Sequence, residues 1–542
     1  MGVVTVVMVL LVAVLAASIL TRALQQKVPL PLMQIGVGVL VGMVPSLRVE
    51  FDPQLFFLLF LPPLLFLDGW RIPKADLFRD SKPILALSLG LVVFTVLGIA
   101  LLLNWMVPDM PLAVAIAVAA VLSPTDPVAF SAVAAKAPIP KRLLHILEGE
   151  SLLNDATGLV FFRFAVAAAM TGSFSVWAGA ATFVYLALGG IAIGYGVTRV
   201  IIWTKAWASR RFGEEPGVQT LISLLIPFVA YMLAEELHCS GILAAVAAGV
   251  TMGMMEFKGQ VLAVTRLRRN AVWDTVQYAL NGFIFVLLGG QFPAIITKVV
   301  NDVGEFAETT PALLAMYILA VTFGMVVLRF MWVWMMFQIA YFRRGLARRA
   351  EDKANFRLMA VLSLAGVRGA ITLAGVLTLP WFLADGSLFP HRDMAILMAC
   401  GVIVLSMVIA TFALPYALKG LTALPDGSAR VRAERVRRVT AMAAIKAIEK
   451  AQHKMSDGRA DADLYNEAAA HVMEYYRLRI FKNIREDSNA IALRMEQVER
   501  ELALVGLKAE RAEIYRMANE KKIDELTARR LVAEVDLMEA RL

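Results

Sequence analysis

Residues 144–171 read LHILEGESLLNDATGLVFFRFAVAAAMT, a stretch that carries two opposing signals. Its length and apolar content are those of a helix that crosses a lipid bilayer, which needs about 20 mainly apolar residues. Its first half nevertheless contains Glu150, Asn154 and Asp155. An ionisable side chain deep in hydrocarbon costs at least ~2.5 kcal/mol, so such residues are candidates for function. The stretch therefore predicts a membrane-spanning helix with a buried polar site.

Further apolar runs of similar length lie on both sides of this one. Of the 542 residues, 59% are hydrophobic and 18% are charged, whereas soluble domains have about 45–50% apolar and about 25% charged residues. We therefore predict an all-α polytopic membrane protein with a transmembrane domain over residues 1–419. Its expected spans, about 13 in all, are 2–22, 30–48, 53–70, 82–104, 111–135, 144–171, 176–203, 217–237, 239–255, 271–291, 310–341, 355–383 and 393–418.

The loops between these runs differ in their content of lysine and arginine. Alternate loops, starting after the first run, hold two to six basic residues each, and the intervening loops hold only Arg48, Lys298 and Arg392. Basic residues are retained on the cytoplasmic side, so the basic loops lie inside. The N-terminus is then outside, and the tail is cytoplasmic. The same alternation supports a break between the eighth and ninth runs, at residues 238–240.

The tail, residues 420–542, is polar and highly charged and is expected to be a helical regulatory region with a break near residues 456–458. The formal net charge of +9 could indicate a nucleic-acid partner. Most basic residues lie in the loops, however, so we expect the lipid bilayer and no nucleic acid. Cys239 and Cys400 lie within apolar runs, and two cysteines allow neither a disulfide framework nor a cysteine zinc site.

Two runs contain clusters of helix-breaking residues. SPTDP occupies positions 123–127 and GVRG positions 366–369, in the fifth run of each half of the domain. Irregular backbone is tolerated within a membrane where it is buried in protein or lines a cavity. Inverted-topology repeats with two broken crossing helices would explain the matching positions, and Asp126 and Arg368 could then neutralise helix termini. Two ordinary proline kinks are the alternative.

One face of the helix predicted over 144–171 carries most of its polar groups. Positions 150, 151, 154, 155 and 158 form a single stripe because residues three and four apart are neighbours on a helix. A carboxylate with nearby hydroxyl and carbonyl oxygens suits a hard monovalent cation, and burial also favours its protonated form. If Asp155 binds either a cation or a proton, the two fluxes are coupled. The alternative is a structural pair between Asp155 and an arginine.

Glu150 is interpreted as a structural residue that forms an ion pair. Arg329 lies in an apolar run and needs a partner, which Glu150 can provide. Breaking such a buried pair would leave an uncompensated charge. Asp68 lies near the end of its run and is interpreted as structural rather than ion-binding, whereas the sequence assigns no role to Arg163.

Five motifs together resemble those of the cation:proton antiporter family, in particular its monovalent cation/proton exchangers of the NhaP/NHE type. They are FLLFLPPLLFLD at 57–68, TDP at 125–127, ESLLNDA at 150–156, SGILA at 240–244 and GVRGA at 366–370. They occur in register across essentially the whole membrane domain.

The resemblance implies that Asp155 carries both the cation and the proton, with Asn154 beside it. It also implies that Ser151 and Thr125 help Asp155 to bind Na⁺. No cofactor is implied beyond the transported Na⁺ and H⁺. The Glu150–Arg329 pair would be structural, and Arg368 would sit at the helix crossover together with Asp126.

We expect the protein to lie in the cell inner membrane. The resemblance implies a homodimer that works by elevator-type alternation. The moving core would comprise about 82–171 and 310–418, and the dimerisation part about 1–70 and 176–291. Relatives with Asn-Asp at this position are generally electroneutral, exchanging one cation for one proton. We therefore expect a secondary Na⁺/H⁺ antiporter that could also accept Li⁺ or K⁺.

Three other functions compete with this one. A K⁺-selective K⁺/H⁺ antiporter on the same scaffold differs in cavity size, which the sequence does not define. A cation channel would have a pore lined continuously by polar groups, whereas here they concentrate in mid-membrane. An enzyme is disfavoured because the five histidines are scattered and no His-Glu-x-x-His motif or Walker loop occurs.

Overall fold

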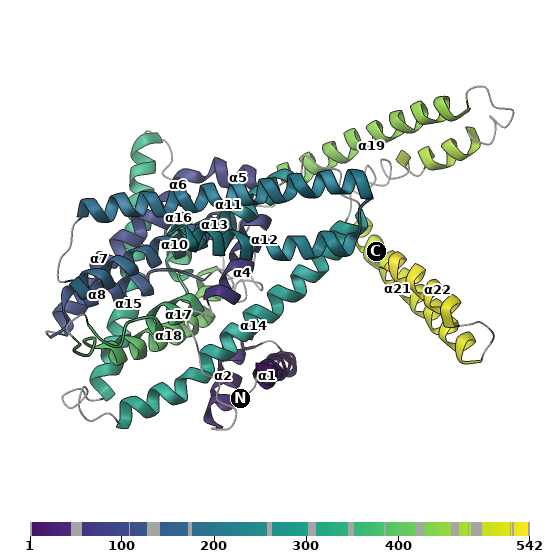
Figure 1. Cartoon of the computed structure of the whole chain (residues 1–542). Helices are drawn as coiled ribbons and strands as arrows, with labels where there is room; N and C mark the ends of the chain where they lie inside the picture. The colour runs from purple at the N-terminus through teal and green to yellow at the C-terminus, as the bar shows by residue number, and fades with distance from the viewer. Residues whose placement is uncertain are drawn as a thin grey trace. The chain divides into compact units, whose positions relative to one another are not determined.

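The computed structural model is almost entirely helical over the residues that it describes (Figure 1). These are 3–25, 27–44, 57–107, 109–126, 141–171, 176–256, 263–301, 311–344, 352–383, 386–418, 427–456, 466–474, 476–477, 490–520, 522 and 525–539. The chain forms two compact units, Met1–Ala423 and Leu424–Leu542.

The membrane unit is a bundle of long apolar helices. In chain order they are α1 (Val3–Ala23), α2 (Leu30–Met43), α4 (Leu61–Arg71), α5 (Lys74–Arg79), α6 (Ser81–Leu85), the π-helical turn η2 (Ala86–Leu91), α7 (Val92–Met106), α8 (Leu112–Leu122), α10 (Lys141–Thr171), α11 (Val176–Phe212), α12 (Pro216–Glu236), α13 (Gly241–Glu256), α14 (Ala263–Asn301), α15 (Pro311–Arg344), α16 (Asp352–Leu364), α17 (Ala370–Leu377) and α18 (Arg392–Leu418). Among the described residues, eight helical segments are long and apolar enough to cross a membrane, and α2, α8 and α13 are shorter apolar helices. A multi-pass helical membrane protein is thus confirmed, whereas the total of thirteen spans stays a prediction.

The helices deviate from the predicted runs where the sequence contains helix breakers. Among the described residues of the run 111–135, α8 ends at Leu122, and Pro124, two residues later, has no amide hydrogen with which to continue the helix. Pro127 and the rest of that run lie outside the described residues. The run 355–383 is two helices, α16 and α17, separated by backbone at 365–369. The predicted break at 238–240 is confirmed, because α12 ends at Glu236 and α13 begins at Gly241.

Packing within the membrane unit is densest inside two groups of helices, which we call the scaffold group and the crossing group. In the scaffold group, α2 packs along α14, and α13 contacts α4, α11 and α12. In the crossing group, α8 packs against α7, α10 and α17, while α15, α16 and α18 pack on one another. Helix α17 also packs on α18, and α15 on α7. The groups meet where α10 touches α4 and α13, and where α14 touches α17 and α18. The scaffold group contains residues predicted for the dimerisation part, and the crossing group contains residues predicted for the moving core. The roles of both parts stay predictions.

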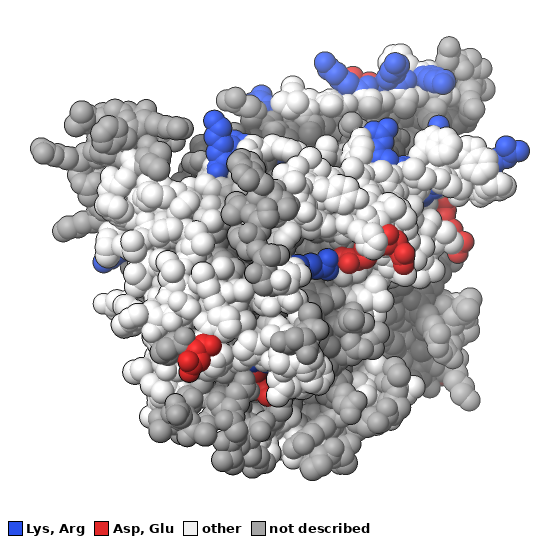
Figure 2. All heavy atoms as spheres, turned by 60° about the vertical axis from the view of Figure 1, so that its left-hand side comes forward, with Lys and Arg blue, Asp and Glu red and all other residues white. Residues whose placement is uncertain are grey.

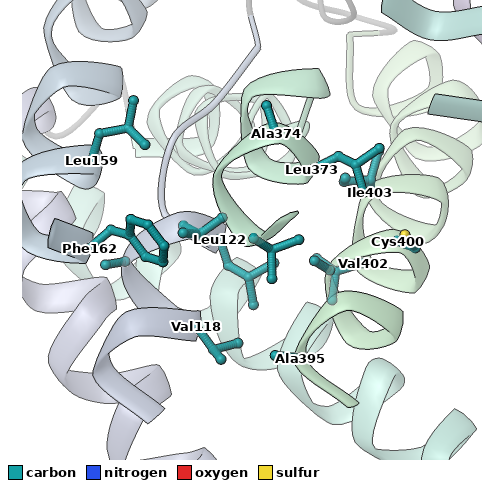
Figure 3. Packing of buried hydrophobic residues seen from close by; sticks show 14 of the residues in the cluster. Val118, Leu122, Leu159, Phe162, Leu373, Ala374, Ala395, Cys400, Val402 and Ile403 are labelled. Carbon is teal, nitrogen blue, oxygen red and sulfur yellow. The ribbon is translucent and has the colours of Figure 1, made fainter. Parts of the chain in front are cut away.

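The core of the crossing group is apolar and tightly packed. Figure 3 shows side chains from four helices meeting there, including Val118 of α8, Phe162 of α10, Leu373 of α17 and Val402 of α18. Each of these is at most 5% exposed. This packing holds α8 and α17 in place, and the irregular backbone that adjoins them carries the candidate site.

Close approach between α2 and α14 depends on glycine. A Cβ placed on Gly38 would lie 2.2 Å from the carbonyl oxygen of Val286. Small residues let membrane helices approach closely, and van der Waals packing then stabilises their association. A Cβ placed on Gly36 of the same helix would meet nothing within 4 Å.

We therefore expect Gly38→Ala to lower the stability of the protein by about 1–3 kcal/mol, the usual cost of overpacking a core. Gly36→Ala is the matched control, and alanine's better helix propensity should leave stability unchanged or raise it by up to ~1 kcal/mol. The check is the melting temperature of the purified protein in detergent. Equal melting temperatures for the two variants would contradict the close α2–α14 packing.

One face of the protein is largely uncharged where it is described. Figure 2 shows that side chains without charge predominate over most of the described area of this face. On α11 the large apolar side chains of Leu188, Trp203 and Trp207 are exposed. Tryptophans are enriched where a membrane meets water, so this exposure suits a helix that faces lipid.

The second unit is also helical where it is described. It contains α19 (Gly427–Ser456), α21 (Ala490–Asn519) and α22 (Glu525–Glu539). Helices α21 and α22 lie side by side (Figure 1) and share an apolar contact that includes Ile514 and Val535. Arg511 forms an ion pair with Asp536 at 2.6 Å across the same contact. The structure describes α19 as far as Ser456, and residues 457 and 458 of the predicted break lie outside the described residues. The regulatory role of the tail stays a prediction.

Candidate ion-binding site

Two irregular segments meet in the crossing group. Residues 123–126 follow α8, and residues 365–369 connect α16 to α17. The backbone amide of Asp126 donates a hydrogen bond of 2.8 Å to the carbonyl oxygen of Val367. Backbone outside a helix is tolerated in a membrane only when its polar groups are satisfied, and this bond meets part of that requirement.

Arg368 lies at this meeting point and is buried. Its Nε donates to the carbonyl oxygen of Leu122, the last residue of α8, at 2.9 Å, and its Nη1 donates to the carbonyl oxygen of Gly366. A helix C-terminus carries a partial negative charge that a cation stabilises. Arg368 thus both satisfies an orphan carbonyl of α8 and neutralises that end of the helix.

Asp126 lies near a helix N-terminus, that of α17. A Cβ placed on Gly369, the residue before α17, would lie 2.1 Å from Oδ2 of Asp126. Only glycine at position 369 therefore allows this carboxylate to approach the N-terminus of α17, where partial positive charge accumulates. The structure brings the two sequence-predicted charges to complementary helix ends.

The polar stripe of α10 binds the segment 123–126 through Thr125. Oγ of Ser151 donates to the carbonyl oxygen of Thr125 at 2.8 Å, and Nδ2 of Asn154 donates to its hydroxyl oxygen, also at 2.8 Å. That hydroxyl donates in turn to Oε1 of Glu150 at 3.3 Å. Both oxygens of Thr125 therefore take part in hydrogen bonds, so the residue positions the segment, and its role as a Na⁺ ligand stays a prediction.

The structure contains a buried Glu150–Arg329 ion pair. Nη1 and Nη2 of Arg329 donate to the two carboxylate oxygens of Glu150 at 2.5 and 2.7 Å, and Nε donates to the carbonyl oxygen of Leu362 at 2.7 Å. Glu150 is 1% exposed and Arg329 is 3% exposed. This bidentate pair connects α10 to α15, and the third hydrogen bond adds α16.

Asp155 is 4% exposed and lines a cavity between the two helix groups. Among the described residues, Asp155 forms no salt bridge, so no lysine or arginine there holds its carboxylate in an ion pair. The polar residues that line the cavity are Asp68, Thr125, Asp126, Ser151, Asp155, Gln277, Asn281 and Thr372. Over the described ranges, no three His, Cys, Asp or Glu residues form a cluster able to hold a metal ion.

Several of these cavity residues were not predicted from the sequence. Asp68 was interpreted as structural, yet it lines the cavity from α4. Gln277 and Asn281 line it from α14, and their spacing of four places them on one helix face, a signal that the sequence does contain. Arg163, which had no assigned role, lies 3.5 Å from Glu235 and connects α10 to α12 at a partly exposed position.

Comparison with known proteins agrees with this architecture. The model of the transmembrane sodium/hydrogen exchanger family matches residues 7–420. The chain belongs to the sodium/hydrogen exchanger family. The family predicted from the five motifs is thus confirmed, and it is a family of membrane-spanning exchangers, which are transporters.

The exchanger has relatives in several bacteria. It is 38% identical to the uncharacterized Na⁺/H⁺ exchanger YjcE of Escherichia coli, over 99% of this chain and 98% of the relative. It is 37% identical to a sodium, potassium, lithium and rubidium/H⁺ antiporter of Bacillus subtilis, over 97% of this chain and 76% of the relative.

A solved structure shares the fold of the exchanger. It is that of the sodium proton antiporter MjNhaP1 from Methanocaldococcus jannaschii, with a TM-score of 0.59 and 18% identity. The similarity covers 78% of this chain and 100% of the other. At this identity the likeness shows the fold alone.

Proposed function

We propose that the exchanger moves a monovalent cation across the membrane in exchange for a proton, and that Asp155 binds the two in turn. The observation that carries this proposal is a buried carboxylate that lines a cavity and has no ion-pair partner among the described residues. A carboxylate held permanently by an arginine could not release a proton to admit a cation. Asp155 is free of that restriction, whereas Glu150 is not.

The surroundings of Asp155 supply oxygens of the kind that a small cation needs. Ser151 and Thr125 line the cavity beside it, and Asn154 holds Thr125 in place. In the proposed cycle, a cation entering the cavity displaces the proton from Asp155, and a proton arriving later displaces the cation. Two occupants that exclude each other are sufficient for coupled exchange.

The position of the cavity supports an elevator-type alternation. Asp155, Ser151 and Thr125 line it from the crossing group, whereas Asp68, Gln277 and Asn281 line it from the scaffold group. The hydrogen bonds of Thr125 and the Glu150–Arg329 pair tie the crossing-group residues into one body. In the proposal this body moves against a scaffold that forms the interface of a homodimer, so that the cavity opens alternately to each side.

The transported cation is proposed to be Na⁺, with Li⁺ and K⁺ as further substrates. A K⁺-selective exchanger is the second candidate, and the Bacillus subtilis relative, whose name includes potassium, favours keeping it. We propose a cell inner membrane location, with the N-terminus outside and residues 420–542 in the cytoplasm as a regulatory tail.

The test is proton flux in vesicles that contain the purified protein and hold an imposed pH gradient. Na⁺, K⁺ and Li⁺ are added in turn, and each transported cation should dissipate the gradient in a saturable manner. Response to K⁺ alone would select the second candidate. Dissipation that does not depend on any added cation would contradict exchange, and an ion current without proton movement would indicate a channel.

Exchange should be electroneutral. Asp155 is the carboxylate proposed to change its occupant, and the residue before it is Asn154, which carries no charge. One positive charge therefore replaces one positive charge in each cycle. We expect the exchange rate to stay unchanged when a potential is imposed across the vesicle membrane, and a net current on a supported membrane would contradict the proposed stoichiometry.

A further inference from the structure

Thr372 is a buried polar residue of the cavity to which neither the motifs nor the mechanism above gives a role. It lies in the first turn of α17 and is 1% exposed. Its hydroxyl has no hydrogen-bond partner among the described residues, although it lines the same cavity as Asp155. A buried hydroxyl without a partner is unfavourable, so its presence calls for a ligand that satisfies it.

The break between α16 and α17 explains why this hydroxyl is unpaired. Threonines inside membrane helices usually donate to the carbonyl oxygen four residues earlier, as Thr157 does to Leu153 and Thr322 does to Ile318. Four residues before Thr372 is Arg368, which lies outside α17 in the irregular segment 365–369. The same break that forms the crossing thus removes the usual helical acceptor of the Thr372 hydroxyl.

We infer that the hydroxyl oxygen of Thr372 is a further ligand of the transported cation. It would contribute an uncharged oxygen from α17, while Asp155 and Ser151 contribute theirs from α10. The hydroxyl has lone pairs to offer and, within the described residues, no competing hydrogen bond. This inference rests on the proposed function, because it names one more residue of the same site.

The chain offers a matched control in Thr198 of α11. Its side chain is 0% exposed, and its hydroxyl also has no hydrogen-bond partner among the described residues. Thr198 is not one of the residues that line the cavity. Replacing either threonine by valine removes a buried, unpaired hydroxyl and keeps the shape, but only the change at 372 alters the cavity.

The experiment measures the melting temperature of the full-length protein against increasing NaCl, with choline chloride keeping the ionic strength constant. An alkaline pH reduces competition by protons. A ligand that binds the folded state raises its stability according to concentration and Kd. We expect Thr372→Val to need about tenfold more Na⁺ than wild type for the same rise, while Thr372→Ser and Thr198→Val behave like wild type.

Exchange assays in vesicles give a second readout. Thr372→Val should raise the apparent KM for the cation about tenfold, with a smaller effect on the maximal rate. Its affinity for protons, measured without a competing cation, should be unchanged, because Asp155 is intact. A residue that only supported the fold would lower the stability of the protein, and its loss would not selectively raise the KM for the cation.

The outcomes separate this inference from the proposed function. If wild type responds to Na⁺ and Thr372→Val responds identically, Thr372 is not a ligand and the exchange proposal stands. If wild type shows no cation-dependent stabilisation and no exchange with Na⁺, K⁺ or Li⁺, both fail. Should the valine variant not fold, Thr372→Ala against Thr372→Ser decides, since both lose the methyl group and only serine keeps the hydroxyl.

Discussion

Asp155→Asn should reduce cation-driven dissipation of a pH gradient to the level of vesicles without protein. The amide keeps the shape of the side chain and part of its hydrogen bonding, but it neither binds a proton near neutral pH nor attracts a cation by charge. Because Asp155 is buried and lines the cavity, this change of one functional group removes the binding group of both proposed occupants. The flux assay with Na⁺, K⁺ and Li⁺ measures the loss directly.

Asp274→Asn is the control for this substitution. Asp274 also lies in an apolar membrane helix, α14, but its side chain is 63% exposed and forms an ion pair with Arg71. Exposed ion pairs contribute about 0–1 kcal/mol, so this variant should fold and exchange normally. Normal exchange by Asp155→Asn in the same experiment would show that another group carries the proton, and the site would have to be reassigned.

The sequence was sufficient to locate the charged and helix-breaking residues whose burial in a membrane costs free energy. Glu150 and Arg329 are far apart in the chain, but each is a charge in an apolar run and needs a partner, and the structure places them in contact. The broken helices were likewise visible as proline and glycine clusters, and the structure joins them at Asp126 and Val367. In each case the cost of an unsatisfied polar group in hydrocarbon restricts the arrangements that can fold.

The opposite wall of the cavity could not be predicted in the same way. Asp68 lies near the end of an apolar run, where capping, snorkelling and gating are all consistent with the sequence, and it was therefore interpreted as structural rather than ion-binding. Asn281 is uncharged, so burying it in a membrane costs less free energy than burying Asp155. Its presence in an apolar run is therefore a weaker indication of function. Which helix of the scaffold group faces the site depends on contacts such as α14 with α17, which join residues distant in the chain. The transport roles of the site residues also stay predictions, because geometry alone does not measure ion binding.

Arg329→Ala should destabilise the protein more than Gly38→Ala does, by about 3–5 kcal/mol. The substitution leaves the carboxylate of Glu150, 1% exposed, without the two hydrogen bonds that it accepts from the guanidinium. It also removes the donor to the carbonyl oxygen of Leu362, so that α16 loses a connection to α15. The melting temperature of the purified variant in detergent measures the loss.

A second substitution distinguishes a stranded charge from a general packing defect. Glu150→Gln in the Arg329→Ala background removes the uncompensated charge while it keeps an acceptor for the hydroxyl of Thr125, so part of the lost stability should return. Arg71→Ala, which breaks the exposed pair with Asp274, should cost about 0–1 kcal/mol and serves as the comparison. If Arg329→Ala melts like Arg71→Ala, the buried pair does not stabilise the fold. If the double variant is no better than the single one, the loss comes from packing around the arginine side chain, and the part of the proposal in which this pair ties α10 to α15 would be withdrawn.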